Sequence, residues 1–403
     1  MAATSTASPR YTIISADCHA GGNHAQYREY LSTEHQATFD AWRGKYKNPF
    51  RDLQDDGRSR NWDSDRRNAD LDAEGVAAEV IFPNTVPPFF PTGVVIAPAP
   101  DPEDFELRLV GIRAHNRWLA DFVAADPARR CGQAQIFLND VDEAVKDIRW
   151  CKAHGINSVL LPGASPDTPW IEPLSSSVYD PIWATCQELD MPVTHHSGGS
   201  GIPKVPDTPI KNLLFVMETG FYANRAFWHM IWGGVFERFP QLKLVVTEQG
   251  SDWVLPILRR MDSLYAQVKN GRVGELGVAS DAVPSLTPSE TFARNIWVGA
   301  SFPTPGDAAF FHEMGIDKVM WGSDYPHHES TSPYSKESLR RSFAGWSEAD
   351  LRKVLAGNAA EVYGFDLSKL DVYAANIGPA VDEIATPLDK IPAGATSPAF
   401  FRS

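Results

Sequence analysis

Cysteine is scarce in this 403-residue sequence, which contains four cysteines and no Cys-x-x-Cys pair. Their spacing is not typical of a disulfide framework. In a chain of this size, isolated cysteines are typical of free thiols in a reducing compartment. We therefore expect no disulfide bonds and a cytoplasmic protein.

Long apolar segments and an excess of positive charge are also lacking. No apolar run approaches the ~18–20 residues that a membrane-spanning helix needs, and residues 1–10 lack the apolar core of a signal peptide. Acidic residues number 51 against 37 basic ones, which gives a formal charge of −14. A surface this acidic argues against nucleic acid and anionic membranes as partners. We expect a globular protein that binds neither.

Eight short apolar runs recur along the chain, each bounded by turn residues. Several are rich in β-branched residues and almost unbroken, as is typical of parallel strands that are buried on both faces. The eight runs are Thr12–Asp17, Ala77–Pro83, Gly132–Leu138, Ser158–Leu161, Met191–His196, Leu242–Glu248, Asn295–Ala300 and Lys318–Asp324.

Longer amphipathic segments separate these runs. Val141–His154 carries apolar residues at helical spacing and is followed by Gly155, a typical helix stop. The other segments of this kind are Tyr179–Leu189, Arg225–Phe239, Asp252–Val268, Asp307–Met314 and Leu351–Tyr363. The repeated alternation of strand and helix predicts an α/β fold, a (β/α)8 TIM barrel. A doubly wound sheet would need a glycine-rich phosphate turn after the first strand, which Asp17–Gly22 does not provide.

The domain organisation that we predict is one barrel over residues 1–370, with a loop insertion at 22–72, and a C-terminal tail at 371–403. The insertion is long and highly charged. We expect it to cover the mouth of the barrel together with the proline-rich loop Pro87–Pro102. The tail has no clear period, and we expect it to wrap the barrel or a partner subunit of a homodimer or higher homo-oligomer.

Candidate metal ligands follow the first and last runs, where the chemistry of a TIM barrel is placed. Asp17 and His19 lie two residues apart, so both side chains point to one face of a strand. Asp324 ends the eighth run. Each residue alone could cap a turn or pack as a polar group, but carboxylates with imidazole suit a divalent cation. Asp324 is also placed to accept the proton of a reacting water or substrate.

Two neighbouring histidines, His195 and His196, end the fifth run. Alternation lets only one of them face the barrel axis and does not decide which. We favour His196 as the ligand because it precedes Ser197-Gly198-Gly199, where the chain must turn.

Glu248 ends the sixth run. Leu244 and Val246 share its face by alternation, and we therefore expect Glu248 to point to the axis. A carboxylate there can be a further ligand, a proton shuttle or a partner that orients a ligand histidine.

Substrate contacts are predicted from residues near the same strand ends. His327 and Asn84 follow the eighth and second runs, and Trp170 could line an aromatic pocket or belong to the core. Arg66 and Arg67, in the insertion, are the cationic candidates for an acidic substrate, with solvent-exposed arginines as the alternative.

Six short segments occur in an order that resembles the metal-dependent amidohydrolase superfamily. The resemblance is strongest to its amidohydrolase-related branch, which includes aminocarboxymuconate-semialdehyde decarboxylase and the resorcylate and dihydroxybenzoate decarboxylases. The segments are Asp17-Cys18-His19, Leu71–Val76, Met191–His196, Gly234–Pro240, Trp321–His327 and Gly357–Ala360.

The resemblance implies that Asp17, His19, His196 and Asp324 bind one divalent metal ion, with zinc the first choice and manganese the second. It implies a non-oxidative decarboxylase that acts on a small aromatic or unsaturated carboxylic acid, with Asp324 or Glu248 handling the proton. A metal-dependent hydrolase of an ester, amide or lactone, which would use a metal-activated water, is the alternative because nearly the same residues serve both reactions.

The sequence departs from the decarboxylases at two positions. Asp17 replaces one histidine of a first-strand His-x-His, and Glu248 stands where the sixth strand usually ends in histidine. The second departure bears on the reaction, because a carboxylate is a better base than acid at neutral pH unless its pKa is raised.

Overall fold

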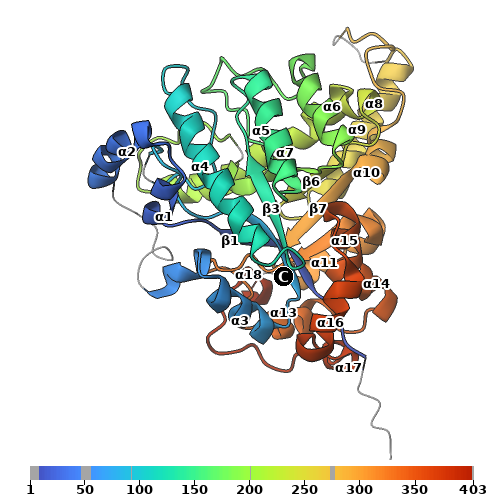
Figure 1. Cartoon of the computed structure of the whole chain (residues 1–403). Coiled ribbons are helices and arrows are strands. Elements are labelled where there is room, and N and C mark those ends of the chain that lie inside the picture. Colours follow the sequence, from blue (N-terminus) through green and yellow to red (C-terminus); the bar gives the residue numbers. More distant parts are fainter. Residues whose placement is uncertain (1–8, 47–55, 92, 200, 273–276, 402–403) are drawn as a thin grey trace, which may run out of the picture.

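The barrel is visible in a computed structural model that describes residues 9–46, 56–91, 93–199, 201–272 and 277–401 (Figure 1). Eight parallel strands form one sheet in the order of the sequence, and helices surround it. The strands are β1 (Ile14–Ala20), β2 (Ala78–Pro83), β3 (Arg130–Gln135), β4 (Ser158–Leu160), β5 (Val193–His196), β6 (Leu244–Thr247), β7 (Ile296–Ser301) and β8 (Val319–Gly322). The prediction of a (β/α)8 TIM barrel is confirmed.

Backbone hydrogen bonds close the sheet between its first and last strands. The amide of Asp324 donates to the carbonyl of Asp17 at 2.8 Å, and the amide of His19 donates to the carbonyl of Tyr325 at 2.6 Å. The closure therefore places the polar end of β1 beside the residues that follow β8.

Two strands differ most from their predicted bounds, and the other six agree to within two residues at each end. β1 continues past Asp17 to Ala20, with an irregularity in its pairing to β2 between Ser15 and Cys18. β3 begins two residues earlier than expected, at Arg130, and ends at Gln135. Polar residues at the end of β1 and the start of β3 are buried in the sheet, so apolar character alone marks only part of each strand. The apolar residues 136–138 are buried too, but they follow β3 and lie outside it.

Eighteen α-helices lie in the described part of the chain. They are α1 (His24–Glu29), α2 (Thr33–Lys45), α3 (Ser64–Glu74), α4 (Phe105–Ala124), α5 (Val141–Ala153), α6 (Asp180–Glu188), α7 (Lys211–Trp232), α8 (Val235–Arg238), α9 (Val254–Lys269), α10 (Pro288–Asn295), α11 (Pro305–Ala308), α12 (Phe311–Met314), α13 (Ser335–Phe343), α14 (Glu348–Arg352), α15 (Asn358–Tyr363), α16 (Leu367–Ile377), α17 (Val381–Ala385) and α18 (Pro398–Phe401). None of these helices is both long and apolar enough to cross a membrane.

The prediction of one helix over Arg225–Phe239 was wrong in its start and in its continuity, while its end agrees with the end of α8 to within one residue. α7 begins at Lys211, and a break at Gly233 and Gly234 separates it from α8. Gly234 has φ 67°, a left-handed conformation that favours glycine. The first turns of α7 escaped prediction because their apolar residues are not confined to one face.

The insertion and the tail contain helices of their own. Between β1 and β2, the described residues form α1, α2, a short 3-10 turn and α3. In the tail, α16 runs through the predicted boundary at residue 370, and α17 and α18 contact α13. The division of the chain into barrel and tail stays a prediction.

A buried ion pair joins α3 to the barrel. Arg67 and Glu79, both fully buried, form a bidentate pair with a shortest distance of 2.6 Å between Nη2 and Oε2. Arg67 also donates from Nη1 to the carbonyl of His19 at 2.7 Å, and its guanidinium lies 4.9 Å from the ring centre of Tyr325. One cation thus touches both strand ends that meet at the closure.

Removing this cation should leave the buried Glu79 without its hydrogen-bonded partner, with Nε of Arg130 3.8 Å away as its remaining ion-pair contact. We expect Arg67→Ala to lower the free energy of unfolding by about 3–5 kcal/mol in urea denaturation. Arg28→Ala, which removes an exposed pair with Asp40, serves as the control and should barely move the midpoint. Equal losses in the two variants would contradict a special role for the buried pair.

Candidate active site

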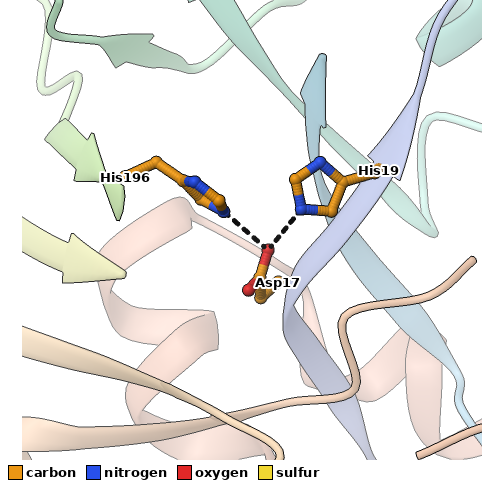
Figure 2. Close-up of side chains that lie close together, drawn as sticks. All are labelled: Asp17, His19 and His196. Atoms are coloured by element: carbon orange, nitrogen blue, oxygen red, sulfur yellow. Dashed lines mark ion pairs between the residues drawn. The ribbon is translucent and has the colours of Figure 1, made fainter. Parts of the chain in front are cut away.

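Three predicted ligands converge at the mouth of the barrel (Figure 2). Oδ1 of Asp17 lies 3.3 Å from Nε2 of His19 and 3.5 Å from Nε2 of His196. Asp17 and His19 come from β1 and His196 from β5, and all three side chains are buried. The closed barrel thus brings residues that are distant in sequence to one point.

Asp324 joins this group from the turn after β8. Its Oδ1 lies 3.2 Å from Nε2 of His19, while its Oδ2 is buried without a hydrogen-bond partner. All four predicted ligands therefore lie close together, each within 3.5 Å of another member of the group.

A backbone contact orients the first histidine. Nδ1 of His19 lies 3.1 Å from the carbonyl of Pro83, and because a carbonyl can only accept, Nδ1 carries the proton. In the neutral ring, the lone pair is then on Nε2, which faces the carboxylates of Asp17 and Asp324. Lone pair and carboxylates repel one another unless a proton or a cation lies between them.

The second histidine has its own orienting carboxylate. Nδ1 of His196 accepts the amide of Gly198 at 3.1 Å and lies 3.4 Å from Oε2 of Glu248. With Nδ1 as an acceptor, the neutral ring carries its proton on Nε2, toward Oδ1 of Asp17. A cation at Nε2 would require the ring to give up the bond from Gly198 and to hold its proton on Nδ1, toward Glu248. His195 faces the other way, with Nδ1 3.1 Å from the carbonyl of Leu161, and burial lowers its pKa to about 4.

The donor atoms fit a divalent cation. Atoms about 2.1 Å from an ion in tetrahedral geometry stand about 3.4 Å apart, and the three contacts Asp17–His19, Asp17–His196 and His19–Asp324 measure 3.2–3.5 Å. Asp17, His19 and His196 form one set of ligand atoms within 4.8 Å of one another, and His19, Asp324 and His327 form a second. Four buried side-chain atoms at this point have no hydrogen-bond partner, one from each residue. They are Oδ1 of Asp17, Nε2 of His19, Nε2 of His196 and Oδ2 of Asp324.

Burial and neighbouring charges shift the pKa values of the site residues in opposite directions. Burial would raise the pKa of Asp17, but the histidines beside it outweigh burial and hold the pKa below its ordinary value. The pKa of Asp324 is likewise lowered, because His327 and His19 outweigh burial. For His19, burial opposes the charged ring, but Asp17 and Asp324 raise its pKa well above the ordinary value. The carboxylates are thus ionised and attract positive charge.

Glu248 differs from these two carboxylates. Burial, together with the negative charges of Asp324 and Asp17, outweighs His196 and raises its pKa to about 7. Its Oε2 accepts a hydrogen bond from the hydroxyl of Ser197.

The expected reason for the position of Glu248 was wrong. Leu244 and Val246 face the layer between barrel and helices, while Thr247 pairs with His196 on the inner face. Alternation alone would therefore turn Glu248 outward. A left-handed backbone with φ 56° breaks the alternation and brings the carboxylate beside His196. Asp324 also has a positive φ, 63°.

A directional chain of hydrogen bonds reaches His327. Asn61 donates from Nδ2 to the carbonyl of Arg58 at 2.9 Å, so its Oδ1 accepts from Nδ2 of Asn84 at 2.7 Å. Oδ1 of Asn84 then faces Nε2 of His327 at 2.8 Å, and Nδ1 of His327 faces Oδ1 of Asp324 at 2.9 Å. Both ring nitrogens of His327 therefore face side-chain oxygens.

The other predicted substrate contacts have mixed outcomes. Arg67 was wrongly predicted, because its guanidinium is buried against Glu79 and cannot reach a substrate. Arg66 donates from Nη1 to the hydroxyl of Ser59, and Trp170 donates its indole N–H to the carbonyl of Pro100 on the loop after β2. The roles of Arg66, Trp170, Asn84 and His327 stay predictions.

Four residues near the ligands were given no role from the sequence. Ser301, at the end of β7, donates to Oδ2 of Asp17, and Ser197 donates to Glu248. Glu329 has a carboxylate oxygen within 4.8 Å of ligand atoms of Glu248, Asp324 and His327. Ser197 directly follows His196 and Glu329 lies two residues after His327, which was an available signal. Asn61 had none, since it lies in the insertion.

The comparison with known families agrees with this geometry. Residues 19–365 match the family described as amidohydrolase. The chain belongs to this family. The resemblance seen in the sequence is confirmed.

Related proteins of this family include decarboxylases. A gamma-resorcylate decarboxylase of Polaromonas sp. is 27% identical over 270 residues, which are 62% of this chain and 75% of the relative. A 2-amino-3-carboxymuconate-6-semialdehyde decarboxylase of Dictyostelium discoideum is 26% identical over 351 residues, which are 85% and 87% of the two chains.

A solved structure shares the fold. The dihydroxybenzoic acid decarboxylase of Polaromonas sp., with bound manganese and the inhibitor 2-nitroresorcinol, has a TM-score of 0.60 at 21% identity. The alignment covers 88% of this chain and 97% of that one.

The convergence of ligand atoms makes metal binding testable residue by residue. After treatment with a chelator, we expect the protein to bind one Mn²⁺ or Zn²⁺ per chain in calorimetry. His196→Ala should weaken binding by more than about a hundredfold. The control His328→Ala changes an exposed neighbouring histidine and should bind as the parent does. Undiminished binding by His196→Ala would contradict the assignment of this ligand.

Proposed function

We propose that this chain is a metal-dependent, non-oxidative decarboxylase of a small aromatic or unsaturated carboxylic acid. The observation that carries the proposal is the group of unpartnered, buried ligand atoms at the barrel mouth. It occurs in an amidohydrolase-family chain whose relatives named above are decarboxylases.

Asp17, His19, His196 and Asp324 would hold one divalent cation. When bound, such a cation supplies Lewis-acid chemistry, polarising the oxygens of a substrate and offsetting negative charge. The side chains themselves are held in place by Pro83, Glu248 and the closure of the barrel. Manganese and zinc both suit these nitrogen and oxygen ligands.

Decarboxylation requires one proton at carbon. The bond from the substrate carbon to the carboxylate breaks, its electron pair stays on that carbon, and a proton replaces the carbon dioxide that leaves. We assign this proton to Glu248, which lies at the mouth with part of its side chain exposed. Ser197 fixes the orientation of its carboxyl group.

Asp324 has a different part in this scheme. Its Oδ2 is free, while its Oδ1 is held by His327 and faces His19. An ionised carboxylate at this point can receive the proton of a substrate hydroxyl. The ring of His327 lies between Asp324 and Asn84, so it orients Asp324 beside the place of a carboxylate substrate.

A hydrolase is the second candidate. The lowered pKa of Asp324 leaves an ionised carboxylate beside the ligand group, which is the base that attack by water requires. The substrate would then be an ester, an amide or a lactone.

The products separate the two reactions. With Mn²⁺-loaded protein and a panel of hydroxybenzoates in deuterated water, we expect carbon dioxide and a phenol with one deuterium at the carbon that lost the carboxylate. A hydrolase would instead place oxygen from ¹⁸O-water in a product of a small ester. Finding the second result without the first would contradict the decarboxylase proposal.

The two carboxylates should respond differently to removal of their charge. Glu248→Gln keeps the shape and should lower kcat by about 10²–10⁴-fold with metal binding retained. Asp324→Asn should abolish turnover and weaken metal binding as well. Asp252→Asn changes an exposed carboxylate four residues after Glu248 and is the matched control. A Glu248→Gln enzyme with parental kcat would remove Glu248 from the mechanism.

A further inference from the structure

The first three turns of α7 expose an unusual amount of apolar side chain. Within the described residues, 14 large apolar side chains count as exposed, and six of them fall between residues 210 and 221. Met217 is 77% exposed and Leu213 is 69% exposed. The six residues are Ile210, Leu213, Phe215, Val216, Met217 and Phe221.

These turns extend beyond the barrel wall. Farther along α7, Ala223, Phe227 and Met230 are buried against the barrel. Val216 lies on the same face of the helix at 100° per residue, yet it is 65% exposed. The described residues of the chain therefore leave both faces of this segment uncovered. Short helices are marginal in water without tertiary packing, so a projecting apolar helix fits a partner.

We propose that this segment is the contact between two copies of the chain, packed as an antiparallel helix pair. Ile210, Leu214, Met217 and Phe221 are spaced by four, three and four residues, which is the spacing of a coiled-coil seam. The seam lies opposite the face that packs on the barrel. A second copy can reach it without displacing any described element.

The pattern of the segment is complementary to itself. In a two-fold antiparallel pair, Leu214 of one copy meets Met217 of the other, and Ile210 meets Phe221. Lys211 and Glu218 are the charged residues between 210 and 221, and they flank one side of the seam seven residues apart. The two-fold axis therefore sets Lys211 of each copy opposite Glu218 of the other.

The other side of the seam is complementary in size. The same axis sets Leu213 opposite Gly220 of the second copy. A side chain added at Gly220 would meet no atom within 4 Å, so the surface beside it is open. A large residue on one copy thus faces an open space on the other.

Charge favours this occupant over a lipid surface. Helices that lie on membranes are rich in Lys and Arg on their polar face, whereas this segment has one lysine and one glutamate and the whole chain carries −14. The inference is independent of the proposed reaction.

Sedimentation of the full chain tests the contact. We expect a dimer at micromolar concentration, and a monomer for Met217→Glu, whose two charges would be buried in the seam and raise the dissociation constant by more than about a hundredfold. Val372→Glu, at a 66% exposed apolar position on α16, is the control and should stay dimeric. A monomeric parent chain, or a dimer that survives Met217→Glu, would overturn the proposal. A monomer that binds phosphatidylcholine vesicles through this face would also overturn it.

A charge exchange tests the antiparallel direction. Glu218→Lys sets like charges opposite each other at both symmetric positions and should weaken the dimer by roughly fivefold or more. Adding Lys211→Glu restores opposite charges in an antiparallel pair and should recover most of the loss. In a parallel pair, residue 211 would face residue 211, and the exchange could not produce this rescue. A double variant as weak as Glu218→Lys would therefore overturn the antiparallel arrangement. Circular dichroism of both variants checks that the fold is retained.

Discussion

The closure of the sheet between β1 and β8 is the constraint on which the site depends. Two peptide hydrogen bonds across this junction hold Asp17 and Asp324 against each other, both buried and both beside Nε2 of His19. Two carboxylates in one buried corner repel, and folding alone does not remove that repulsion. The corner is therefore a strong attractor of positive charge, whether from a protonated ring or from a metal ion.

The basic side chains near this corner stand at different depths. Arg67 lies behind the junction and touches the carbonyl of His19, while His327 lies at the mouth beside Asp324. Arg67 is already neutralised by Glu79, so it steadies the backbone without balancing the carboxylates. Among the described residues, the ion-pair partners of Asp17 and Asp324 are therefore histidines, and neither lysine nor arginine.

Much of the architecture was available from the sequence because buried parallel strands and amphipathic helices have distinct periods. The four candidate ligands could be named from the sequence too, since a polar residue that ends an apolar strand is conspicuous. The directions in which these side chains point were not available from the sequence. Only the structure shows that His196 and not His195 turns inward, and that Glu248 reaches the site through a left-handed backbone rather than through alternation. Such backbone conformations depend on the surrounding fold and leave little trace in residue order.

Arg67 illustrates a second limit of prediction from the sequence, which is that the burial of a charged residue depends on distant partners. Arg66 and Arg67 stand side by side in a charged insertion, and composition treats them alike. The two side chains have different surroundings in the structure. Helix α3 directs Arg67 toward the barrel, where it pairs with Glu79 on β2. The burial of Arg67 depends on Glu79, which lies on another element, and the residues next to Arg67 in the sequence do not reveal this partner.

The hydrogen-bond chain through Asn61 and Asn84 has a polarity that begins at a peptide carbonyl. That carbonyl belongs to Arg58, in the insertion between β1 and β2. The amide oxygen that faces His327 is thus oriented by the backbone of a peripheral loop rather than by the barrel. Rebuilding that loop changes the group that faces this ring at the mouth of the site, with Asp17, His19, His196 and Asp324 left in place.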